Sequence, residues 1–218
     1  MIGAVLAGIG TPLAMAVGLR RVLSVPTGQD IFLLFGAGAA TAFVAMVVEN
    51  LIWGFVGHSL PQAYGLLIRA FLMIALVEEL AKLGMMLGRL RSNPETDFRT
   101  FAAVAATIGA GFAGTENIVY VFHRGEGVLV MRLLTATPFH FAVAIVAARM
   151  LWLSIREGAE WYLPAALSTS TLLHGLYDYA IFTSTVGDGK YWFTLAMTLS
   201  LAIGLLRRKD AASGTETT

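Results

Sequence analysis

The chain has 218 residues, of which 57% are hydrophobic and 13% are charged, and its formal net charge is +1. Soluble domains carry about 25% charged residues, so this composition and a mean hydropathy of +0.73 exclude a soluble globular enzyme and a disordered chain. Because the net charge is close to zero, the chain lacks the excess of basic residues that nucleic-acid binding requires, and we expect no nucleic-acid partner. The sequence has no cysteine, which excludes disulfides, thiolate metal sites and cysteine nucleophiles.

Seven apolar stretches follow one another along the chain, and each is longer than a typical strand. They cover roughly residues 2–19, 31–56, 64–88, 99–122, 128–153, 162–184 and 191–206. A membrane-spanning helix needs roughly 20 apolar residues, and these stretches do not alternate as barrel strands do. We therefore predict an all-α, polytopic membrane bundle of about seven transmembrane helices. Residues 1–206 are expected to form a single transmembrane domain, and residues 207–218 a polar cytoplasmic tail.

The positions of Lys and Arg predict the orientation of this bundle. With the N-terminus outside, the inner side would hold Arg20, Arg21, Arg89, Arg91, Arg99, Arg149, Arg156, Arg207, Arg208 and Lys209. The outer side would hold Arg69, Arg124, Arg132 and Lys190. Because positive residues are enriched on the cytoplasmic side of membrane proteins, we predict an outside N-terminus and a cytoplasmic C-terminus.

Several ionisable residues interrupt the apolar stretches. Each costs about 2.5–3.5 kcal/mol on insertion scales, and such residues mark functional sites. They are Glu49, Glu78, Glu79, Lys82, Glu116, Arg132, His140, His174 and Asp178. Residues three or four positions apart share a helix face, which applies to Glu78, Glu79 and Lys82 and to His174 and Asp178. We expect four helices to turn these faces inward and form one polar pocket.

The known hydrolase signatures narrow the chemistry of this pocket. A His-Glu-x-x-His zinc motif is absent, and so is a Gly-x-Ser-x-Gly nucleophile elbow. An aspartyl dyad needs a second intramembrane aspartate beside Asp178, and the apolar stretches contain none. Water activated by a glutamate therefore remains.

Three short motifs carry a resemblance to a known family. Residues 78–82, Glu-Glu-Leu-Ala-Lys, look like the EExxK motif of the PrsW intramembrane proteases. Residues 112–116 match the FxxxE motif of that family, and residues 174–178 match its HxxxD motif. The three motifs occur in the family's order on successive helices. The resemblance covers roughly residues 65–185, which we expect to be the catalytic core.

The resemblance implies an activity and a set of site residues. The implied function is proteolysis of a single-span membrane-protein substrate, as in site-1 cleavage of an anti-sigma factor, by a multi-pass protein of the inner cell membrane. The expected catalytic residues are Glu78, Glu79, Glu116, His174 and Asp178. The expected supporting residues are Lys82, Phe112, His140 and Arg132. The superfamily also contains the CAAX prenyl endopeptidases and the APH-1 subunit of γ-secretase, but Glu116 in the second motif departs from the prenyl endopeptidases.

A mechanism can be assigned to these residues as a hypothesis. Glu78 and Glu116 would hold and activate water, while Glu79 would share that role or pair with Lys82. His174 would face the oxyanion, Asp178 would orient or support His174, and His140 would be a further donor. We expect a metal-independent reaction, with zinc bound by Glu78, Glu116 and His174 as the alternative.

Two other functions and one geometric difficulty stay open. The same fold could serve as a non-catalytic membrane scaffold. It could also be a proton-coupled transporter, since the segments around Glu49 and Glu116 resemble each other as repeats do. Counting residues along upright helices at 1.5 Å per residue separates Glu78 from Glu116 by roughly 15–20 Å, so the two must be brought together by tilt or bending.

Overall fold

The computed structural model describes residues 1–25, 28, 30–60, 64–184 and 189–208. These residues form helices and connecting segments, with no strand among them, as the predicted all-α class requires. The predicted tail lies outside the described residues from residue 209 onward. The prediction of a single domain over residues 1–206 stays a prediction.

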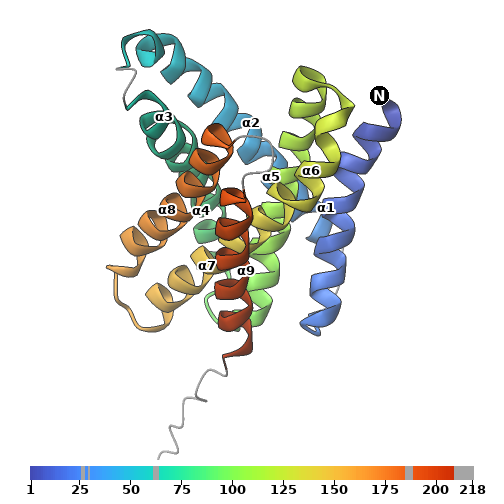
Figure 1. Cartoon of the computed structure of the whole chain (residues 1–218). Helices are drawn as coiled ribbons and strands as arrows, with labels where there is room; N and C mark the ends of the chain where they lie inside the picture. Colours follow the sequence, from blue (N-terminus) through green and yellow to red (C-terminus); the bar gives the residue numbers. More distant parts are fainter. Residues whose placement is uncertain (26–27, 29, 61–63, 185–188, 209–218) are drawn as a thin grey trace, which may run out of the picture.

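The described residues form seven long helical segments (Figure 1), in agreement with the seven apolar stretches. Six of the long helices are α1 (Ile2–Val22), α2 (Asp30–Val56), α5 (Phe98–Arg124), α7 (Ala136–Arg156), α8 (Tyr162–Thr183) and α9 (Lys190–Arg207). The third long segment joins α3 (Gly65–Ile68), the π-helix η2 (Arg69–Ala75) and α4 (Leu76–Ser92). The shorter elements are η1 (Gly57–Ser59), η3 (Glu126–Val128) and α6 (Leu129–Leu134).

The fifth predicted stretch, 128–153, is divided into two helices at Thr135. This residue has φ −121° and ψ −67°, outside the helical region. Pro138 explains the division, because proline has no N–H and its ring would clash with the carbonyl of Leu134 in a continuous helix. In the first turn of α7 the missing N–H is tolerated. The break lets α6 leave the direction of α7 and carry Arg132 toward α5.

Helix α5 lies at the centre of the bundle and packs against α1, α2 and α7. Its residues from Phe101 to Gly114 are all buried. The approach of α2 is so close that a Cβ at Gly38 would lie 2.0 Å from the Ile108 carbonyl oxygen. A Cβ at Gly111 would lie 1.9 Å from the Phe35 carbonyl oxygen. We call this backbone-to-backbone contact the α2–α5 seam. Small residues permit such contacts between membrane helices.

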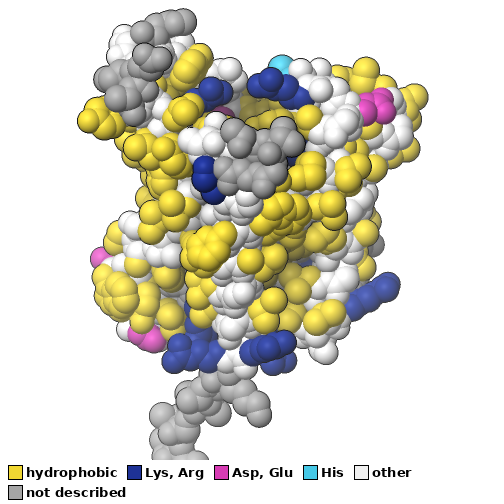
Figure 2. Space-filling model, viewed as in Figure 1, with side chains coloured by type: hydrophobic (Ala, Val, Ile, Leu, Met, Phe, Trp, Pro, Cys, Tyr) yellow, Lys and Arg dark blue, Asp and Glu magenta, His cyan; other side chains and the backbone are white. Residues whose placement is uncertain are grey.

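The outer surface of the bundle is apolar, as a lipid-facing surface should be. Large hydrophobic side chains such as Leu6, Phe43 and Phe193 are more than 60% exposed. Figure 2 shows hydrophobic side chains over the middle of the molecule, with Lys and Arg gathered toward its two ends. Three helical stretches, α1, α2 and the stretch Glu126–Arg156, are long and apolar enough to cross a membrane. The count of seven spans and the orientation stay predictions.

Candidate active site

Helix α4 supplies the first group of polar side chains. Glu78, Glu79 and Lys82 are all buried, with at most 4% of each residue exposed. Lys82 Nζ donates to Glu79 Oε1 at 2.5 Å and lies 3.9 Å from Glu78 Oε2. The lysine therefore pairs with Glu79, which is one of the two roles that the sequence left open for that residue.

Helix α8 brings His174 onto the α4 carboxylates. Its Nδ1 lies 2.7 Å from Glu79 Oε1, and its Nε2 lies 3.6 Å from Glu78 Oε2. An ionised carboxylate only accepts hydrogen bonds, so Nδ1 donates to Glu79, while Nε2 faces Glu78. Gly175 makes this approach possible, because a Cβ there would lie 2.3 Å from the Phe71 ring of η2.

The expected contact between Asp178 and His174 is longer than a hydrogen bond. The Asp178 carboxylate lies 3.6 Å from His174 Nε2, which is beyond hydrogen-bonding distance. Glu79, at 2.7 Å from the other ring nitrogen, is the carboxylate that orients His174. The sequence pattern favoured Asp178 because it lies one turn from His174 on the same helix, whereas the contact with Glu79 joins two helices.

Helices α5, α6 and α7 supply the second group. His140 Nε2 lies 2.6 Å from Glu116 Oε2, and the same carboxylate forms an ion pair with Arg132 at 3.2 Å. His140 Nδ1 lies 3.3 Å from Lys82 Nζ, which joins the two groups. The ring of Phe112 lies 4.5 Å from Lys82 Nζ and 5.3 Å from the His140 ring, so it packs against both.

All nine predicted site residues therefore lie in one neighbourhood. We call it the polar centre; its residues are Glu78, Glu79, Lys82, Phe112, Glu116, Arg132, His140, His174 and Asp178. Glu78 and Glu116 line the same cavity of about 800 Å³. Glu116 does not contact the α4 side chains directly; it contacts His140, which in turn contacts Lys82. Figure 1 shows α8 inclined to α9 rather than parallel to it, so residue counts along upright helices misjudge the separation of side chains on different helices.

The possible metal ligands differ from the expected set. Glu78, His140 and His174 each offer one ligand atom, and these atoms lie within 4.8 Å of one another. His140 replaces the expected Glu116, because the Glu116 carboxylate contacts the His140 ring and Arg132 instead.

The chemistry of this trio fits a divalent cation. Glu78 Oε2 is buried and has no hydrogen-bond partner among the described residues. Each histidine contacts a carboxylate outside the trio, Glu79 for His174 and Glu116 for His140. Such contacts fix the ring orientation of metal-binding histidines. Two imidazoles and a carboxylate are ligands that zinc accepts.

Two polar residues beside the polar centre were missed or left without a role. Asn117 is fully buried; its amide accepts a hydrogen bond from Arg132 Nε at 2.9 Å and donates to Thr137 Oγ1 at 3.1 Å. Its position directly after Glu116 could have revealed it. Glu49 lines the same cavity, and its Oε1 is buried without a hydrogen-bond partner in the described part of the chain.

Comparison with known proteins gives one family. The model described as PrsW family intramembrane metalloprotease matches residues 29–204, which is most of the chain and includes the whole polar centre. No curated protein and no solved structure matches the chain. The family description favours the metal-dependent alternative over the metal-independent reaction expected from the residues.

Proposed function

Because the chain belongs to the PrsW family of intramembrane metalloproteases, we propose that its polar centre hydrolyses a peptide bond in a membrane-protein substrate. The observation that carries this proposal is the environment of the Glu78 carboxylate. Its Oε2 is buried, lacks a hydrogen-bond partner among the described residues and lies 3.6 Å from His174 Nε2, and both residues line a cavity of about 800 Å³. A buried carboxylate oxygen without a partner is costly, and a bound water or cation at this point would remove that cost.

In this proposal Glu78 holds the attacking water at Oε2. We assign this role to Glu78 rather than Glu79, because Glu78 lines the cavity and Glu79 does not, while Lys82 and His174 contact Glu79 Oε1. His174 Nε2 accepts the proton of that water and passes it to the leaving amine, as general base and then general acid. Lys82 Nζ, at 3.9 Å from Glu78 Oε2, is the nearest positive charge to the developing oxyanion.

A divalent cation would give an alternative arrangement, in which His174 Nε2 would be a ligand instead of the base. Glu78, His140 and His174 would hold it; when bound, zinc lowers the pKa of a water molecule and polarises the scissile carbonyl. Glu79 and Glu116 keep the two imidazole rings in position, while Lys82 and Arg132 neutralise those two carboxylates.

The family resemblance implies the substrate class, and the place of the polar centre inside an apolar bundle supports it. We propose a single-span membrane protein, of the anti-sigma-factor kind, in the inner cell membrane. Unpaired peptide groups are costly in lipid, so a cavity with polar walls lets an unwound segment of such a substrate keep its backbone groups satisfied.

Cleavage by the purified protein tests this function. A panel of single-span membrane proteins in proteoliposomes would be incubated with wild type, with Glu78→Gln and with Glu95→Gln. Glu95 is an exposed loop carboxylate and serves as the matched control. We expect Glu78→Gln to lower the cleavage rate about 10²-fold, because the attacking water would be held less well, and Glu95→Gln to leave it unchanged.

A chelator arm addresses the cation in the same assay. Loss of cleavage on treatment, with recovery on adding zinc, would support the trio as its site. Absence of cleavage across the panel by folded wild-type protein would contradict the proposal and favour a scaffold. Proton flux into liposomes that Glu116→Gln abolishes would favour a transporter.

A further inference from the structure

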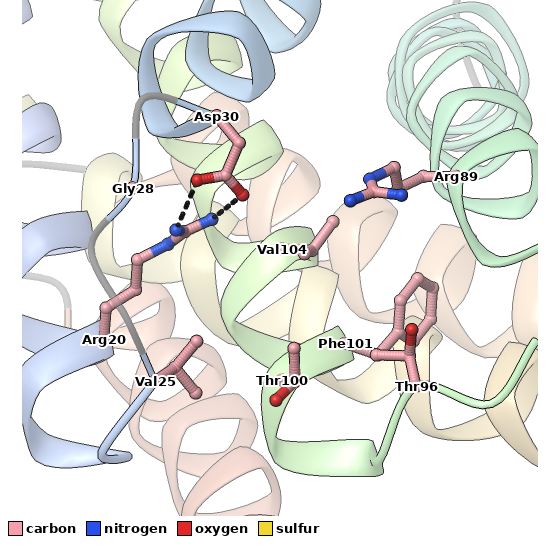
Figure 3. Close-up of a pocket in the computed structure, with 9 residues that line it drawn as sticks. All are labelled: Arg20, Val25, Gly28, Asp30, Arg89, Thr96, Thr100, Phe101 and Val104. Carbon is pink, nitrogen blue, oxygen red and sulfur yellow. Dashed lines mark hydrogen bonds and ion pairs between the residues drawn. The ribbon is translucent and has the colours of Figure 1, made fainter. Parts of the chain in front are cut away.

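A second cavity lies at the opposite end of the bundle from η3 and α6, where α1 and α4 end and α2 and α5 begin. Its volume is about 240 Å³, far above the roughly 10–15 Å³ that one water needs. It shares no lining residue with the cavity of the polar centre. We call it the basic-end cavity; Figure 3 shows its nine lining residues, which are Arg20, Val25, Gly28, Asp30, Arg89, Thr96, Thr100, Phe101 and Val104.

One wall of the basic-end cavity is an internally neutralised pair. Arg20, whose side chain is 2% exposed, binds the Asp30 carboxylate through both terminal nitrogens, at 3.1 and 3.2 Å. This two-pronged pairing matches the geometry that guanidinium groups prefer for carboxylates. The pair joins α1 to α2 and contributes no net charge to the cavity.

The opposite wall carries a charge without a partner. Arg89 projects from α4 toward the space between itself and the Arg20–Asp30 pair (Figure 3). No hydrogen bond, ion pair or cation–π contact joins it to another described residue. The lining charges therefore leave one uncompensated positive charge. An anion would be attracted to the Arg89 guanidinium, while a cation would be repelled by it.

The remaining lining selects the kind of anion. Phe101 and Val104 give the cavity an apolar wall beside Arg89 (Figure 3). Planar, forked guanidinium groups bind phosphate oxygens in pairs. Both α1 and α4 end in basic turns at this end of the molecule, which the predicted orientation places at the cytoplasmic leaflet, where anionic lipids concentrate.

We propose that the basic-end cavity binds an anionic phosphate group, with Arg89 as the residue that pairs with it. The phosphate belongs to the headgroup of an anionic phospholipid or to a soluble phosphate compound, and the experiment separates the two sources. This inference is independent of the proteolytic activity, because binding is measured without a substrate.

Binding to the full-length protein in detergent provides the test. Native mass spectrometry would measure retention of phosphatidylglycerol, which is anionic, and of phosphatidylcholine, which is zwitterionic. Wild type would be compared with Arg89→Gln, with Arg89→Lys and with Arg91→Gln. Arg91 lies two residues further along the same helix, is exposed, and does not line the cavity, so it controls for loss of a positive charge from this end.

We expect wild type and Arg91→Gln to retain phosphatidylglycerol preferentially, and Arg89→Gln to bind it about tenfold more weakly. Arg89→Lys should bind with intermediate strength, since it keeps the charge but loses the fork. Displacement of the lipid by millimolar glycerol phosphate would assign the cavity to a soluble phosphate compound. Equal losses in Arg89→Gln and Arg91→Gln would overturn the proposal. So would equal retention of the two lipids with no binding of glycerol phosphate.

Discussion

The α2–α5 seam and the polar centre both involve α5, but they pack in opposite ways. In the seam, glycines bring backbone against backbone, so that a Cβ at Gly111 would overlap the Phe35 carbonyl. In the polar centre, long charged side chains meet around a cavity of about 800 Å³, and Glu78 Oε2 stays without a hydrogen-bond partner among the described residues. The comparison indicates that tight apolar contacts fix the helices, while the site keeps unsatisfied groups that an ideally stable core would exclude.

The largest stability effect is expected from breaking the ion pair of the polar centre. In Lys82→Met the Glu79 carboxylate would stay buried with His174 as its remaining partner. Loss of one member of a buried pair costs about 3–5 kcal/mol, and we expect this decrease in the free energy of unfolding, measured by denaturant titration in mixed micelles. Arg91→Met, an exposed change on the same helix, is the control. If both variants unfolded alike, the pair would not stabilise the fold.

A somewhat smaller effect is expected in the seam. Gly111→Ala would force α2 and α5 apart, because the atom in the way is a backbone oxygen rather than a movable side chain. Overpacking typically costs 1–3 kcal/mol, and we expect about 3 kcal/mol here in the same titration. Gly10→Ala in α1 is the matched control, since no atom lies within 4 Å of its added Cβ. A Gly111→Ala protein as stable as wild type would contradict the tight seam.

The smallest effect is expected at the periphery of the polar centre. Arg132→Gln removes the ion pair with Glu116, which contacts His140. Partners that orient metal-binding or catalytic histidines are worth 10- to 100-fold, and we expect kcat to fall about tenfold with KM unchanged. The exposed Arg99 provides the control variant Arg99→Gln. A change confined to KM would instead indicate that Arg132 contacts the substrate.

Much of the fold could be predicted from the sequence because lipid imposes helices on long apolar stretches. The charged members of the polar centre stand out in such stretches, whereas Phe112 is singled out by the FxxxE motif alone. The pairings among these residues could not be predicted. Glu79 rather than Asp178 orients His174, and His140 rather than Glu116 joins the possible metal ligands. These contacts join different helices, and single-helix spacing carries no information about helix tilt.

Two backbone irregularities differ in how strongly the sequence signals them: the division between α6 and α7, and the π-helix η2. Pro138 provided a signal for the division at Thr135, since proline restricts the preceding turn. The π-helix η2 had no comparable signal, because its residues Arg69–Ala75 are ordinary helix formers. π-Segments are rare and often occur at functional sites, so composition alone favours a regular helix there.

That π-segment has a consequence for how the EExxK motif is aimed. Each residue advances an α-helix by about 100°, so the wider turn at η2 shifts the rotational phase of everything after it. The face of α3 and η2 that packs on α8 and the face of α4 that carries Glu78 and Glu79 therefore need not continue a single stripe. The π-helix at Arg69–Ala75 therefore sets the direction in which the Glu78 and Glu79 side chains leave the helix axis. This direction could change without any change in the motif itself.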